Sequence, residues 1–166
     1  MKRLMLATLL ILPLGAYAAG APDATFYKHA AEGGIAEVDL GNLALKKTTA
    51  PGVQEYAAMM VKDHSAANEK LQSIAASKNI TLPTTPSVGQ MATKAKLDVL
   101  TGKTFEDSYI KAMVKDHETT ITLFRHEAAT GQDPDAKAFA KATLPTLKEH
   151  LKKIQELASA AGVTAG

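Results

Sequence analysis

The sequence predicts an all-α fold in which four long helices form a bundle with one long crossover between the second and third helices. Three observations lead to this prediction. Four segments repeat apolar residues at three- and four-residue spacing, which is the period of an amphipathic helix. Two of the connections are tight turns, whereas the middle one is long and contains prolines. The chain is rich in alanine, with four Phe and no Trp, which favours closely packed helices over a sheet.

Residues 1–18 are predicted to be a secretory signal peptide. The segment starts with basic residues and continues with an apolar run up to Leu14 that is too short to cross a bilayer. It ends in Ala16-Tyr17-Ala18, the small-x-small pattern of a cleavage site. We therefore expect a periplasmic or secreted protein with a single helical domain over residues 19–166. Retention of the segment as an uncleaved anchor stays open as the alternative.

The charges of the chain balance once the predicted signal peptide is removed. The full chain has 19 Lys and Arg residues and 17 Asp and Glu residues. Lys2 and Arg3 lie in the signal peptide, which holds no acidic residue, so 17 of each sign remain. We therefore expect no nucleic-acid partner and, after cleavage, no stable membrane insertion, whereas a homo-oligomer stays open. The chain has no cysteine, so disulfides and thiol chemistry are excluded.

The first two helices are expected over residues 22–47 and 53–78. In both segments the apolar residues fall on one stripe at helical spacing. Gly33 and Gly34 each weaken the first helix by roughly 1 kcal/mol relative to alanine, but small residues there allow a neighbouring helix to approach closely. Pro51-Gly52 marks a tight turn, so the two helices should be antiparallel.

The middle connection is expected to be an extended crossover over residues 79–90, because it contains two prolines and a glycine. A short additional helix is expected over residues 91–100. The third long helix should begin after Thr104, which is predicted to be its N-cap, and should end at Gly131.

The fourth long helix is expected to start at Asp133-Pro134 and to continue through Pro145, where a kink is predicted because proline has no N–H group. The second tight turn makes the third and fourth helices antiparallel. The long crossover allows the second and third helices to run in the same direction. One long crossover is the connectivity of ferritin-like bundles.

A nine-residue motif occurs twice in the chain, and both copies carry a histidine. Tyr56-x-x-x-Met60-Val61-Lys62-Asp63-His64 recurs 53 residues later as Tyr109-x-x-x-Met113-Val114-Lys115-Asp116-His117, with six of nine positions identical. Each copy places its histidine on the apolar stripe of its helix. A histidine in that position is costly unless it has a partner.

Four polar side chains on the apolar stripes are expected to lie at one height in the bundle. Glu37 and His64 are nearly equidistant in sequence from the first turn. His117 and His150 differ by three residues in their distance from the second turn, which at about 1.5 Å per residue is an offset of roughly 4.5 Å, within side-chain reach. Each long helix therefore sends one side chain that can bind a metal ion into the interior.

Two interpretations of this Glu/His layer stay open. In the first, which the sequence favours, the chain is a non-enzymatic helical-bundle protein of unknown role, with envelope stress as one setting. The layer is then a closed hydrogen-bond network that sets helix register. In the second, the four side chains bind a transition metal ion (zinc, copper or iron) in a metal-binding or metal-dependent redox protein. Asp63 and Asp116 would then orient the imidazoles of neighbouring helices.

The two interpretations differ in what they require of the ring nitrogens. A metal site requires nitrogens that converge with no protein donor between them. A network requires those nitrogens to be consumed by the two aspartates or by the hydroxyls of Tyr56 and Tyr109. A further idea is that Met60 and Met113, each four residues before a histidine, favour copper(I), although methionines at this spacing are more often core residues.

Short motifs on all four predicted helices resemble those of a known family. They are Glu37-Val38-x-Leu40-Gly41, Met60-Val61-x-Asp63-His64, Phe105-x-x-x-Tyr109, Met113-Val114-x-Asp116-His117 and Leu144-Pro145-x-Leu147-x-x-His150. With these motifs the chain resembles the bacterial domain-of-unknown-function family 4142, whose members are secreted, ferritin-like four-helix proteins. The resemblance covers about residues 24–157.

This resemblance implies the fold and is compatible with a metal site, but it implies no biochemical activity. The chain also departs from the di-iron pattern, which needs a Glu on two helices and Glu-x-x-His on the other two. Val61, Val114 and Leu147 stand three residues before the histidines where that pattern requires glutamate. One carboxylate on the stripes instead of four argues against ferroxidase or iron-storage activity.

Overall fold

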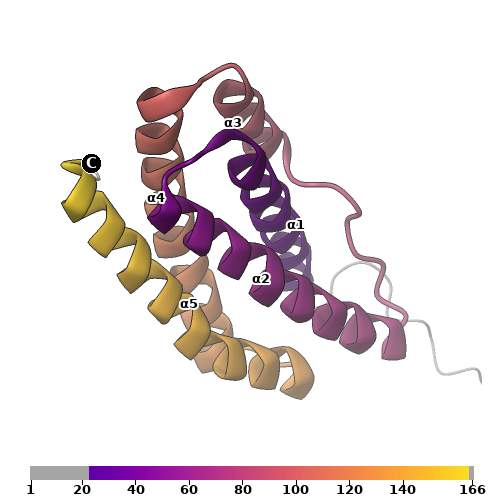
Figure 1. Cartoon of the computed structure of the whole chain (residues 1–166). Helices are drawn as coiled ribbons and strands as arrows, with labels where there is room; N and C mark the ends of the chain where they lie inside the picture. The colour runs from indigo at the N-terminus through magenta and orange to yellow at the C-terminus, as the bar shows by residue number, and fades with distance from the viewer. Residues whose placement is uncertain (1–22, 165–166) are drawn as a thin grey trace, which may run out of the picture.

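The computed structural model describes residues 23–164, and within this range the protein contains helices and no strand (Figure 1). The all-α prediction is therefore confirmed, and the five helices in this range are four long ones and one short one. The predicted signal peptide lies outside the described residues. The helices are α1 (Ala24–Lys47), α2 (Pro51–Ser77), α3 (Val88–Asp98), α4 (Gly102–Thr130) and α5 (Pro134–Ala161).

The long helices pack in pairs that are sequential in the chain. α1 packs mainly on α2, and α4 packs mainly on α5. α1 also contacts α4, and α2 contacts α5, so α2 and α4 lie across the molecule from each other. Figure 1 shows that the segment after α2 runs back along the molecule to α3, so α2 and α4 run in the same direction.

The short helix α3 starts earlier than the sequence predicted, and its cap explains the difference. Ser87 and Gln90 form a capping box, in which each side chain bonds the backbone N–H of the other. The expected cap at Thr104 is wrong, because α4 begins at Gly102 and its N-cap is Thr101. Gly102 has a φ of 55°, a left-handed conformation that favours glycine and allows the turn from α3 into α4.

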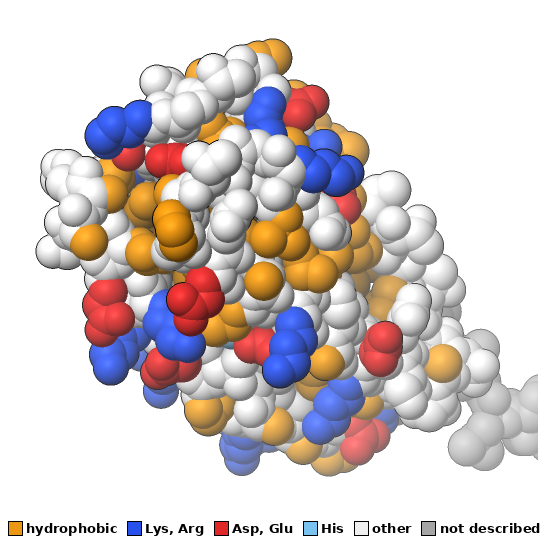
Figure 2. All heavy atoms as spheres, viewed as in Figure 1, with side chains coloured by type: hydrophobic (Ala, Val, Ile, Leu, Met, Phe, Trp, Pro, Cys, Tyr) orange, Lys and Arg blue, Asp and Glu red, His pale blue; other side chains and the backbone are white. Residues whose placement is uncertain are grey.

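The apolar core consists of two clusters, one towards each end of the long helices. The first cluster includes Leu40, Met60 and Met113, and the second includes Leu71 and Phe124. The predicted Glu/His layer lies between these clusters in the sequence of every long helix. None of the described helices is both long and apolar enough to span a membrane. On the face in Figure 2, basic and acidic side chains are interspersed.

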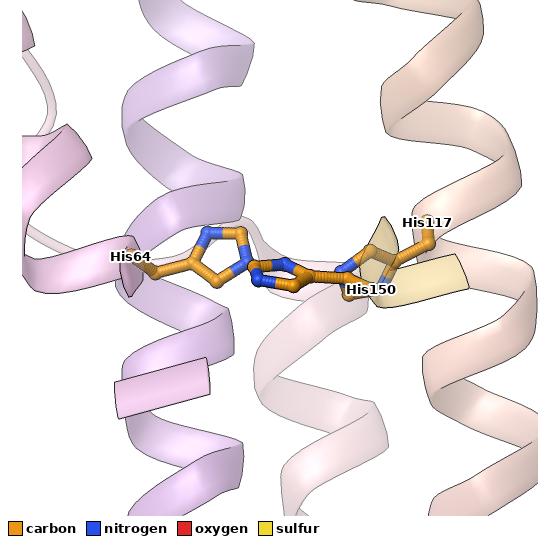
Figure 3. Close-up of side chains that lie close together, drawn as sticks. All are labelled: His64, His117 and His150. Atoms are coloured by element: carbon orange, nitrogen blue, oxygen red, sulfur yellow. The ribbon is translucent and has the colours of Figure 1, made fainter. Parts of the chain in front are cut away.

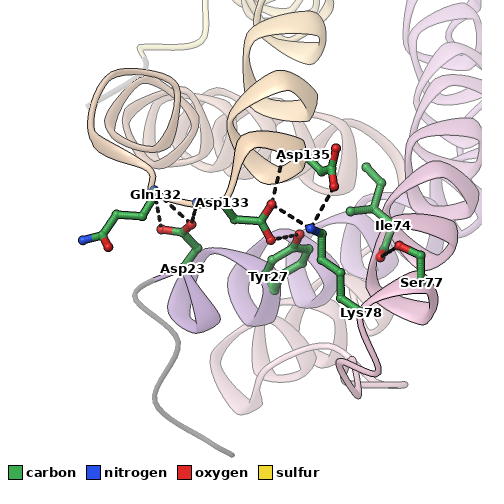
Figure 4. Close-up of polar contacts among 8 residues, drawn as sticks. All are labelled: Asp23, Tyr27, Ile74, Ser77, Lys78, Gln132, Asp133 and Asp135. Carbon is green, nitrogen blue, oxygen red and sulfur yellow. Dashed lines mark hydrogen bonds and ion pairs between the residues drawn. The ribbon is translucent and has the colours of Figure 1, made fainter. Parts of the chain in front are cut away.

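Polar contacts tie three chain segments together at one end of the molecule (Figure 4). The Asp23 carboxylate accepts hydrogen bonds from the backbone N–H groups of Gln132 and Asp133, so it joins the start of α1 to the turn between α4 and α5. Lys78, just after α2, pairs with Asp133 at 3.0 Å and with Asp135 at 2.8 Å. These contacts fix the axial position of one helix pair relative to the other.

Close approach between α1 and α2 depends on glycines of α1. A Cβ atom at Gly34 would lie 1.9 Å from Oδ1 of Asn68. A Cβ atom at Gly41 would lie 2.8 Å from Cγ2 of Val61 and 3.0 Å from the backbone oxygen of Ala57. The contact at Gly41 involves backbone, so it cannot be relieved by moving a side chain alone.

We expect Gly41→Ala to lower the free energy of unfolding by about 1–3 kcal/mol, because the added methyl group forces α1 and α2 apart. Gly89→Ala is the matched control, since Gly89 also lies in a helix but has open space around its Cβ position. It should stabilise the protein by up to about 1 kcal/mol through helix propensity. Urea unfolding of both variants measures this, and equal effects would contradict the assigned close approach.

Candidate metal centre

Three histidines from three helices meet between the two apolar clusters (Figure 3). His64 comes from α2, His117 from α4 and His150 from α5. Their ring centres lie 5.7 Å apart for His64 and His117, 5.4 Å for His64 and His150, and 5.5 Å for His117 and His150. One ligand nitrogen of each ring lies within 4.8 Å of the others. The exposed fractions are 7%, 1% and 1%, so water has little access to the rings.

Each imidazole keeps one buried nitrogen without a hydrogen-bond partner. His117 Nδ1 lies 3.0 Å from the backbone oxygen of Met113, so it donates its proton there and leaves Nε2 bare. His150 Nε2 lies 3.0 Å from Oδ2 of Asp63, which leaves Nδ1 bare. His64 Nε2 is also buried without a partner. In His117 and His150, the other ring nitrogen is hydrogen-bonded to a backbone oxygen or to a carboxylate. Hydrogen bonds of this kind orient imidazoles around metal ions in proteins.

Burial keeps these imidazoles neutral at physiological pH. Desolvation lowers the pKa of His64 well below its ordinary value, and the neighbouring histidines lower it further. Desolvation lowers the pKa of His117 to about 4. It also lowers the pKa of His150, although the adjacent Asp63 carboxylate opposes this effect. A neutral imidazole is the protonation state that binds a metal ion.

Glu37 does not join the three bare nitrogens but lies on the other edge of the His117 ring. Its Oε1 is 3.6 Å from His117 Nδ1. Glu37, Asp116 and His117 form a second group whose ligand atoms lie within 4.8 Å of one another. The structure therefore brings together three of the four side chains predicted to share a height, and it places the fourth with Asp116.

The Glu37 carboxyl is buried, with an exposed fraction of 2%, and neither of its oxygens has a hydrogen-bond partner within the part of the chain that the structure describes. Burial raises its pKa well above the ordinary value, and the charge of the adjacent Asp116 raises it further. The two carboxyls can hydrogen-bond to each other when one of them holds a proton.

The two copies of the repeated motif have different neighbours. Asp63 of the first copy reaches across to His150 on α5. Asp116 of the second copy lies beside Glu37 on α1. The hydroxyls of Tyr56 and Tyr109 are buried without a partner, so neither consumes a histidine nitrogen.

A small cavity adjoins the layer and was not foreseen from the sequence. It measures about 30 Å³ and is lined by Glu37 and His64 together with Asn68 and Thr120. This volume is enough for one or two water molecules. The position of Asn68 over Gly34 shapes it, and no sequence pattern marks Asn68.

Comparisons with known proteins identify the chain's family and nothing beyond it. The model of one family, described as Domain of unknown function (DUF4142), matches residues 13–157. No curated protein and no solved structure matches the chain.

We expect the free energy of unfolding of the metal-free protein to fall as the pH decreases from 6.5 to 4. In this window the unfolded histidines bind protons, whereas folded His117 binds one only near pH 4, so the unfolded state gains stability. For His117 alone this interval corresponds to about 3 kcal/mol. The raised pKa of Glu37 acts in the opposite direction, because the folded state then holds the extra proton above pH 4.5.

Urea unfolding at pH 7, 5.5 and 4 measures this dependence. His117→Gln should flatten it, whereas His126→Gln, at an exposed histidine, should leave it unchanged. A wild-type stability that is constant over this range would contradict the assigned neutral, buried state of the ring.

Proposed function

The chain belongs to the family described as Domain of unknown function (DUF4142), and from this premise we propose that it is a metal-binding protein. His64, His117 and His150 would hold one transition metal ion. The observation that carries the proposal is that each imidazole has one buried nitrogen without a hydrogen-bond partner among residues 23–164, and that one nitrogen of each ring lies within 4.8 Å of the others.

The spacing of the rings supports this assignment. Three imidazoles that each bind a tetrahedral zinc ion through one nitrogen have ring centres about 5.2 Å apart. The three observed separations, 5.4 to 5.7 Å, exceed this value by a few tenths of an ångström. Side-chain rotations of that size need no movement of the helices.

The energetics of the layer also favour a metal ion over a structural network. A buried polar atom without a partner costs about 1–3 kcal/mol. A network that sets helix register would satisfy the ring nitrogens, but here one nitrogen of each ring is unsatisfied. A metal ion would satisfy all three at once without adding a donor.

The ligand set favours zinc or copper(II). Neutral imidazoles suit both ions, and the chain has no thiolate to select others. Met60 and Met113 belong to an apolar cluster, which does not favour a thioether site for copper(I). Three protein ligands leave one coordination position for water or a small ligand, as in zinc sites that exchange ligands.

We further propose that this is a non-enzymatic, ferritin-like four-helix protein of the periplasm or extracellular space. The signal-like pattern of residues 1–18 supports the location. The pairwise packing of the four long helices and the returning segment after α2 support the ferritin-like connectivity, with α3 as an addition. Metal capture under envelope stress is a role that fits this combination.

We expect purified protein to bind one equivalent of Zn²⁺ or Cu²⁺ in a calorimetric titration. His64→Ala, His117→Ala and His150→Ala should each weaken binding by about 100-fold or more, because each removes a ligand. At a free metal concentration of about 100 Kd, the ion should raise the free energy of unfolding by about 2.7 kcal/mol.

His29→Ala and His126→Ala are the controls for this titration, because both histidines are exposed and lie outside the three-histidine group. Their affinities should equal that of the wild type. An absence of binding, or an equal loss in the exposed variants, would overturn the proposed function.

We expect Asp63→Asn to weaken metal binding by about 10–100-fold, because Asp63 accepts the Nε2–H of His150 and aims Nδ1 at the centre. Asp107→Asn is the matched control, since both carboxylates have an exposed fraction of 32% and each has one ion-pair partner. The same calorimetric titration compares them. An unchanged affinity in Asp63→Asn would show that this hydrogen bond does not orient the ligand.

A further inference from the structure

The Glu37–Asp116 pair is a second polar centre that the three-histidine site does not use. The two carboxyls come from neighbouring helices, α1 and α4, and lie next to the Nδ1 edge of His117. The Nδ1–H group of His117 already donates a hydrogen bond to the backbone oxygen of Met113, so His117 has no free nitrogen on this side. What remains is a pair of carboxyls facing each other in the interior.

No positive side chain compensates this pair among residues 23–164. The only ion-pair contact of Glu37 there is with His117, which is neutral, and neither carboxylate contacts a lysine or arginine. Two uncompensated carboxylates are unstable in a buried setting. They must either share a proton or bind a cation.

Two tyrosines lie near His117: the ring centre of Tyr56 is 6.3 Å from that of His117 and 6.5 Å from that of Tyr109. The hydroxyls of Tyr56 and Tyr109 are fully buried and have no hydrogen-bond partner. Burial raises the pKa of both hydroxyls, so they keep their protons. Glu37 and these hydroxyls therefore supply buried oxygen atoms that have no hydrogen-bond partner among residues 23–164, whereas Asp116 Oδ2 accepts one from Thr120 at 3.3 Å.

The pair is also reachable from the surface. Asp116 is half-buried and lines a groove of about 410 Å³ between α1, α3 and α4. Water in this groove can complete the coordination of an ion bound to Asp116. Lys111 and Lys115 also line the groove, but they are exposed, so salt screens their repulsion of a cation.

We propose that Glu37 and Asp116 bind a second divalent cation of the oxygen-preferring kind, separate from the three-histidine centre and on the opposite edge of His117. Oxygen ligands favour Mg²⁺, Ca²⁺ or Mn²⁺ over copper and zinc. Two oxygens on one such ion at about 2.1 Å lie roughly 3 Å apart when adjacent and about 4.2 Å when opposite. The observed separation of ligand atoms, within 4.8 Å, is compatible with that geometry.

Mn²⁺ is the probe for this site, because its electron paramagnetic resonance signal distinguishes free from bound ion. Titration of the purified protein should show one bound Mn²⁺ per chain below about 1 mM. Glu37→Gln and Asp116→Asn should each weaken binding by about tenfold or more, because each removes a charged ligand while keeping the side-chain shape. His64→Ala should bind Mn²⁺ as the wild type does.

Glu127→Gln is the matched control. Glu127 is also buried with an unpartnered oxygen, but it lies at the far end of α4 next to the α4–α5 turn. Its substitution should leave Mn²⁺ binding unchanged. Thermal unfolding of every variant establishes that each one is folded before its affinity is compared.

Two results would overturn the proposal: no Mn²⁺ bound below about 1 mM, or equal binding in the wild type, Glu37→Gln and Asp116→Asn. In either case the pair holds a shared proton instead of an ion. A zinc titration of the same samples separates this outcome from the proposed function. If the protein binds zinc but not Mn²⁺, the three-histidine centre is supported and the carboxyl site is not. If it binds Mn²⁺ but not zinc, only the carboxyl site is supported.

Discussion

Burial of polar groups between two apolar clusters is the constraint on which the rest of the structure depends. Desolvation keeps the three imidazoles neutral and raises the pKa of Glu37. The same exclusion of water leaves several ring nitrogens and carboxyl oxygens without partners. A layer of this kind is costly in a protein of ordinary stability. The proposed ions would satisfy these atoms and so offset the cost of burying them.

The layer exists only if the helices keep their register. A slip of one residue moves a side chain about 1.5 Å along the axis and turns it by about 100°. Within each helix pair a short turn fixes the register, and Gly41 lets α1 and α2 approach closely. Between the pairs the register is fixed by Asp23, which binds the α4–α5 turn, and by Lys78, which pairs with the start of α5. The polar contacts at one end thus position nitrogen atoms at mid-height.

Helix periodicity and turn positions were sufficient to predict that His64, His117 and His150 meet, because height along a helix follows from residue number alone. The side-chain rotamer and the rotation of each helix relative to its neighbours do not follow in this way. Glu37 therefore has the expected burial but lies on the other edge of His117. The choice of hydrogen-bonded nitrogen on each ring depends on contacts between distant segments. The N-cap of α3 was not predicted, because Ser87 directly follows a proline and lies within the segment that was assigned to the crossover.

The repeated Asp-His motif accounts for the two different groups of polar side chains in one layer. The motif lies on α2 and α4, which run in the same direction on opposite sides of the molecule. Exchanging α2 with α4 and α1 with α5 leaves the packing pattern of the long helices unchanged, because α1 packs on α2 as α5 packs on α4. Under this exchange the pair Asp63–His150 corresponds to the pair Asp116–Glu37. An imidazole on α5 thus stands where α1 has a carboxyl, so one half of the layer presents nitrogen and the other presents oxygen, and the two halves should select different ions.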